Sequence, residues 1–131
     1  MIAALPGFKA LNAALASSIR DSLVNEAVTI TSLSGITGSA LGGMSIALAS
    51  MSKTYVAAGA QSGIMPEVLH RVASMASGGM DTLPHNGAII TLLAITGLTH
   101  RQSYGDIFMM TIIKTVAVFF IIALYYLTGI T

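Results

Sequence analysis

The residues best suited to chemistry lie in one short segment, SMASGGMDTLPHNG. Gly78 and Gly79 permit backbone conformations that end a helix, and Asp81 or Thr82 can cap the next one. A helix start presents unpaired N–H groups and a positive dipole end, which together bind anions. Histidine commonly serves in proton relays, so His85 is a candidate for that role. The segment therefore predicts an anion-binding helix break with a titratable group beside it.

Asp81, His85 and Asn86 would then stand within about a turn of that helix start. Ionisable side chains are costly at membrane depth, so at such a depth they indicate function. The alternative is a loop outside the membrane, where Asp-Thr-Leu-Pro is an ordinary cap with Pro84 in the first turn. The residues alone leave both interpretations open.

A second glycine-rich segment, GITGSALGGMS, lies at residues 35–45. Gly38 and Gly42 form a GxxxG pattern, which is typical of close helix packing. Thr37 and Ser39 can donate to a substrate carboxylate or to the backbone carbonyl a turn earlier. Ligand binding and helix packing are thus both compatible with this segment.

Other polar residues have simpler interpretations. Lys114 shares a helix face with Thr111 and Thr115, so we expect that face to turn toward protein. Lys114 can contact substrate, reach the headgroups, or pair with a helix absent from this chain. Glu26 either caps a helix start, the favoured interpretation, or lies in a water-filled vestibule. The pair His100-Arg101 is typical of a membrane flank.

The composition restricts the class of protein. Hydrophobic residues make up 54% of the 131 residues and charged residues only 8%, against roughly 25% charged in a soluble domain. A free-standing soluble enzyme and a disordered chain are both disfavoured. The net charge of +1 gives no field for nucleic acid, and the absence of cysteine rules out disulfides. No metal-ligand cluster or enzyme motif is present in the sequence. A membrane-embedded chain remains.

Residues 107–130 form the clearest membrane span, with a capping-box pattern beginning at Ser103. Residues 27–52 and 82–100 also contain no Asp, Glu, Lys or Arg, but glycine or proline interrupts both segments. Short interrupted segments of this kind are typical of discontinuous helices at a transporter's binding site. Polar connections are expected over residues 9–26 and 53–71.

We therefore predict an all-α polytopic membrane fragment that forms a single unit over residues 1–131. It would contain an entry segment, a glycine-interrupted re-entrant hairpin, a broken helix and a C-terminal transmembrane helix. The runner-up is a non-transporting membrane fragment, or an assembly module that packs through its glycine surfaces.

The two glycine-rich segments and their surroundings closely resemble the C-terminal part of the gluconate permease (GntP) family. The resemblance is carried by residues 35–45, 70–88, 97–101, 106–108 and 113–115. It implies a proton-coupled symporter of gluconate or a related hydroxy acid in a bacterial inner membrane, not an enzyme. Family members are much longer than this chain, so the resemblance also implies a missing N-terminal repeat or other protomers as partners, beside the lipid bilayer.

The resemblance further implies roles for residues of this sequence. The turn of the re-entrant hairpin and the break of the discontinuous helix would hold the substrate. No cofactor or metal is implied apart from the coupled proton. The expected substrate-binding residues are Thr37, Gly38, Ser39, Gly43, Ser77, Gly78, Gly79, Thr82 and Asn86. We further hypothesise that Asp81 or His85 handles the coupled proton, because these two titratable residues lie at a helix break in an apolar run.

Overall fold

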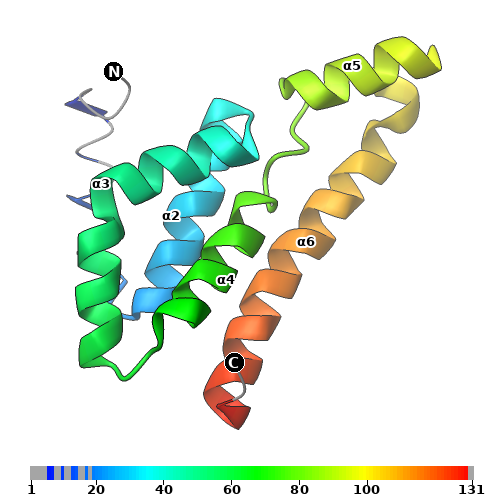
Figure 1. Cartoon of the computed structure of the whole chain (residues 1–131). Helices are drawn as coiled ribbons and strands as arrows, with labels where there is room; N and C mark the ends of the chain where they lie inside the picture. Colours follow the sequence, from blue (N-terminus) through cyan, green and yellow to red (C-terminus); the bar gives the residue numbers. More distant parts are fainter. Residues whose placement is uncertain (1–5, 8–9, 11–12, 15–16, 18, 130–131) are drawn as a thin grey trace.

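The computed structural model describes residues 6–7, 10, 13–14, 17 and 19–129, and among these no residue lies in a β-strand. The helices, shown in Figure 1, are α2 (Ser22–Thr37), α3 (Ala40–Gln61), α4 (Pro66–Ser77), α5 (Gly87–Thr96) and α6 (His100–Thr128). The all-α prediction is confirmed for this part of the chain. The arrangement of the helices in a membrane stays a prediction.

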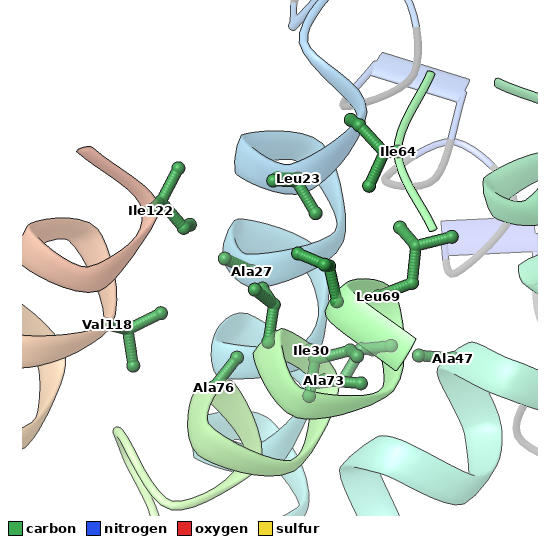
Figure 2. Close-up of a cluster of buried hydrophobic side chains, with 13 residues drawn as sticks. Leu23, Ala27, Ile30, Ala47, Ile64, Leu69, Ala73, Ala76, Val118 and Ile122 are labelled. Carbon is green, nitrogen blue, oxygen red and sulfur yellow. The ribbon is translucent and has the colours of Figure 1, made fainter. Parts of the chain in front are cut away.

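Helix α2 is the central element, because α3, α4 and α6 all pack against it. Figure 2 shows its apolar residues Leu23, Ala27 and Ile30 between the side chains of α4 and α6. At the start of α2, the Tyr126 hydroxyl of α6 donates to Asp21 Oδ2 at 2.6 Å. The same Asp21 caps α2 through Oδ1, which accepts from Val24 N at 2.9 Å.

Because Asp21 is the cap, Glu26 lies one turn inside α2 and is buried. The prediction that Glu26 caps a helix is therefore wrong. The predicted entry segment over residues 9–26 lies partly outside the described residues, and its last part belongs to α2.

Helices α2 and α3 form a hairpin whose turn is made by Gly38 and Ser39. Gly38 adopts a left-handed conformation with φ +62°, which suits glycine. Ser39 then caps α3, since its Oγ accepts from Gly42 N at 3.1 Å. Gly38 thus lies outside the helices, so Gly38 and Gly42 do not form a helical GxxxG stripe.

The polar connection predicted over residues 53–71 is wrong, because α3 continues to Gln61. Gly63, with φ +71°, follows the end of α3, and Pro66 begins α4 at a position where proline suits a helix. Lys53, a charged residue inside the predicted connection, is an exposed residue of α3.

The predicted break after α4 is present, but the predicted caps for the next helix are wrong. Helix α4 ends at Ser77, and a loop over residues 78–86 leads to α5, which extends away from the bundle (Figure 1). Asn86 caps α5, since its Oδ1 accepts from Ala88 N at 2.7 Å. Asp81 and Thr82 cannot serve because both bind residues of α6.

Helix α6 begins at His100, earlier than the predicted start at residue 107. Its capping box is formed by Thr99 and Gln102, whose Oε1 accepts from Thr99 N at 3.0 Å, so the box expected from Ser103 is wrong. The predicted end at Ile130 lies outside the described residues. Helix α6 is long and apolar enough to cross a membrane, and only 17% of its most apolar window is buried. A core helix of a soluble protein would be mostly buried.

Candidate functional site

The two glycine-rich segments, far apart in the sequence, meet at the end of α2. His85, in the loop after α4, places Nε2 2.8 Å from the carbonyl oxygen of Gly35. A Cβ on Gly38 would lie 2.8 Å from Cδ2 of the same imidazole. A Cβ on Gly35 would lie 3.2 Å from that of Met80. The hairpin turn and the helix break therefore form one site.

The contact with Gly35 fixes the protonation of one nitrogen of His85. A carbonyl oxygen only accepts hydrogen bonds, so Nε2 must donate and carry a hydrogen. Nδ1 is then the nitrogen that can take up or release a proton. His85 is exposed, so a proton can reach it from solvent.

Lys114 pairs with Asp81, and this pair ties the loop to α6. Lys114 Nζ lies 2.6 Å from Asp81 Oδ1, and the two side chains are 32% and 29% exposed. The face of α6 that carries Lys114 does turn toward protein, and its acidic partner comes from this chain. Thr111 of the same face shares a hydrogen bond with Thr82.

Gly79 allows the loop to approach α2 and α6 closely. A Cβ at Gly79 would lie 3.2 Å from Thr31 Cγ2 of α2 and 3.2 Å from Thr115 Oγ1 of α6. Thr31 Oγ1 donates to the carbonyl oxygen of Ala76 at 3.0 Å, which fixes the end of α4 on α2. Gly78 has φ −79°, a conformation open to any residue, so its predicted special backbone is not used.

The other residues expected to touch substrate are engaged inside the protein. Asn86 is 6% exposed, and its Nδ2 donates to the carbonyl oxygen of Asp81, so it shapes the loop. Thr37 Oγ1 donates to Leu33 O at 2.8 Å, and Ser77 Oγ donates to Ser74 O at 2.8 Å. Gly43 lies directly against the backbone of Ser34, where a Cβ would overlap it.

An open hollow of about 650 Å³ lies beside the loop, and it joins His85 with His100, Arg101 and Tyr104, which the sequence did not assign to the site. Its lining residues are Pro84, His85, His100, Arg101 and Tyr104. His100 Nε2 lies 3.1 Å from the carbonyl oxygen of Pro84, which holds the start of α6 against the loop. The sequence gives no signal for this grouping, because α5 separates Pro84 and His85 from the residues at the start of α6.

A guanidinium and two imidazoles beside one hollow are suited to a carboxylate and neighbouring hydroxyls. The described residues contain no group of three His, Asp or Glu side chains placed to hold a metal ion.

The chain is similar to a bacterial transporter. Over 129 residues, 98% of this chain, it is 66% identical to the Bacillus subtilis (strain 168) protein named Uncharacterized transporter YxjC. The chain spans 27% of the length of that relative. No family model and no solved structure matches the chain. The similarity supports a role in transport, which is not an enzymatic activity.

Proposed function

We propose that this chain forms part of a gluconate permease (GntP)-type secondary transporter, a proton symporter of gluconate or a related hydroxy acid in a bacterial inner membrane. One observation carries the proposal: His85 contacts Gly35, so the glycine turn and the helix break share one site. Interrupted helices that meet in this way are how many transporters build a binding site. The similarity to a transporter supports the class, and so does α6, which is long and apolar enough to cross a membrane.

In this proposal the substrate carboxylate binds Arg101 in the hollow. A guanidinium offers a carboxylate two parallel hydrogen bonds. His85 and His100 each use Nε2 to donate to a backbone carbonyl oxygen, so the Nδ1 atom of each neutral ring accepts a hydrogen bond from a substrate hydroxyl. The hydroxyl groups of the two joined segments also bind substrate, and to do so they give up their hydrogen bonds within the protein. These are the hydroxyls of Thr37, Ser39 and Thr82.

Asp81 and His85 handle the coupled proton. Protonation of Asp81 removes the negative partner of Lys114, and the positive charge that this leaves is balanced by the substrate carboxylate bound at Arg101. One proton and one carboxylate enter together, so the charge of the site does not change. A charge without a partner is costly in a membrane, and this cost links the two binding events.

The test is uptake by the complete transporter in proteoliposomes under an inward acid gradient. Labelled gluconate, a shorter hydroxy acid and 3-hydroxybutyrate serve as substrates. We expect Arg101→Gln to lower uptake about 10-fold or more, on the scale of a hydrogen bond to a charged group. Arg71→Gln is the matched control, because Arg71 is exposed on α4 and lies outside the hollow. Equal uptake by both variants would overturn the carboxylate site.

One observation favours a second candidate, a non-transporting packing module. Gly43 lies on the backbone of Ser34, so it serves the contact between α2 and α3. A module of this kind would form oligomers in proteoliposomes and give no saturable flux of organic acid. Saturable flux would exclude it.

A further inference from the structure

Helix α2 buries a carboxyl group that the proposed transport site does not use. Glu26 is 2% exposed, and its Oε2 accepts no hydrogen bond from any described residue. Burying an ionised carboxylate without a compensating partner is far costlier than burying the neutral acid. The packing seen here therefore favours the neutral, protonated form of Glu26.

Glu26 lines a cavity of about 210 Å³ enclosed by α2, α3 and α4. The cavity is separate from the hollow beside His85, with which it shares no lining residue. Most of its lining is apolar and comes from α3 and α4, including Met44, Leu48, Val56, Leu69 and Ala73.

Two other titratable groups line the same cavity. Tyr55 of α3 is 3% exposed and interacts electrostatically with Glu26, and His70 of α4 is exposed. Helix α6 also packs against α2 but contributes no residue to this lining. His70 is therefore the exposed titratable residue of this lining, and Glu26 and Tyr55 are its buried ones.

A proton fits this cavity better than a metal cation does. Hard cations bind several oxygen ligands at once. Here the side-chain oxygens among the lining residues are those of Glu26, Ser52 and Tyr55, and the rest of the lining offers carbon, sulfur and the imidazole of His70. A proton neutralises the carboxyl without any coordination shell.

We propose that Glu26 is a binding site for a second coupled proton, distinct from the proton at Asp81. The site is occupied while the α2–α3 hairpin is packed on α4, and it releases its proton when the hairpin moves and water reaches the carboxyl. This inference rests on the proposed symport, but it concerns the cavity between α2, α3 and α4, and not the contact of the 78–86 loop with α6.

The test measures the number of protons that enter with each substrate molecule. Glu26→Gln keeps the size of the side chain and fixes it in a neutral form. We expect this variant to transport with the proton-to-substrate ratio lowered by one proton. Glu67→Gln is the control, because Glu67 is an exposed carboxyl on α4, and it should keep the full ratio. An unchanged ratio in Glu26→Gln would overturn the proposal.

An infrared measurement on the unsubstituted full transporter detects a protonated carboxyl directly, and the conservative variant Glu26→Asp assigns the band. We expect a protonated-carboxyl C=O band at neutral pH that changes when gluconate is added, and that moves in Glu26→Asp. A band that is missing, or that does not respond to substrate, contradicts the second proton site. If the unsubstituted transporter takes up no acid under a proton gradient, the proposed function fails instead, and the two failures are distinguishable.

Discussion

At the scale of single residues, Gly38 meets two separate requirements. Its φ of +62° disfavours any side chain, and the His85 ring occupies the space that a Cβ would need. Gly63 has a similar φ, +71°, but faces open space. A side chain at Gly63 would incur backbone strain alone, whereas one at Gly38 would incur the same strain and also displace His85.

We predict that Gly38→Ala reduces uptake and stability more than Gly63→Ala does. Both variants incur a left-handed backbone cost of about 1–2 kcal/mol, and only Gly38→Ala also displaces His85. Thermal unfolding in detergent and uptake assays would measure the difference. Adding His85→Ala to Gly38→Ala should restore part of the lost stability. Equal effects of the two glycine variants would show that the His85 contact has no role.

The pair of Asp81 and Lys114 belongs to the same scale. We predict that Asp81→Asn abolishes the dependence of uptake on the acid gradient, and that His85→Ala weakens it. Asp106→Asn, an exposed carboxyl on α6, should leave it intact. Uptake as a function of external pH is the measurement. Undiminished proton-coupled uptake in both Asp81→Asn and His85→Ala would refute the assignment.

At the scale of the elements, the α2–α3 hairpin depends on a close approach at Gly43. A methyl group there would overlap the backbone of Ser34, which the rigid hairpin cannot move without separating its helices. We predict that Gly43→Ala destabilises the protein by about 1–3 kcal/mol, the range for overpacking a core. Gly105→Ala on α6 meets nothing within 4 Å and should be neutral or stabilising. Denaturant titration in detergent measures both, and a neutral Gly43→Ala would disprove the close packing.

The breaks between helices could be predicted because their signals are local. Gly38 after α2 and Gly78 after α4 mark positions that do end helices. The starts of α5 and α6 are not predicted correctly from the sequence, because several residues near each start can act as the N-cap. Asn86 and Thr99 cap α5 and α6, while Asp81 and Thr82 are occupied by α6.

The site itself could be predicted only in part. Its glycine motifs and titratable residues stand out in the sequence, but their contacts depend on how α2, α4 and α6 pack. No spacing indicates that His85 reaches Gly35, or that Arg101 returns to the same loop. The burial of Glu26 is likewise a tertiary effect, since its position on α2 allows either a surface or a core.

At the scale of the whole molecule, α5 and α6 leave large apolar side chains uncovered. Ile95, Phe120 and Leu127 are 80%, 66% and 85% exposed. Large apolar side chains as exposed as these are suited to contact with lipid or with another protein surface. In our proposal lipid covers part of this surface, and the rest of a longer transporter covers the remainder, as the length of the relative suggests.

The central claim is that the hairpin turn and the helix break bind one substrate together. Substrate protection of single cysteines tests it most directly, and this chain has no cysteine of its own. Ser39→Cys and Thr82→Cys would each be placed in the complete transporter, with any other cysteine removed, and alkylated with and without gluconate. The control is Ser62→Cys, exposed beyond the far end of α3. We predict that gluconate or a related hydroxy acid slows alkylation at Ser39→Cys and Thr82→Cys but not at Ser62→Cys. Protection at neither position, or at only one of the two, would contradict a shared site.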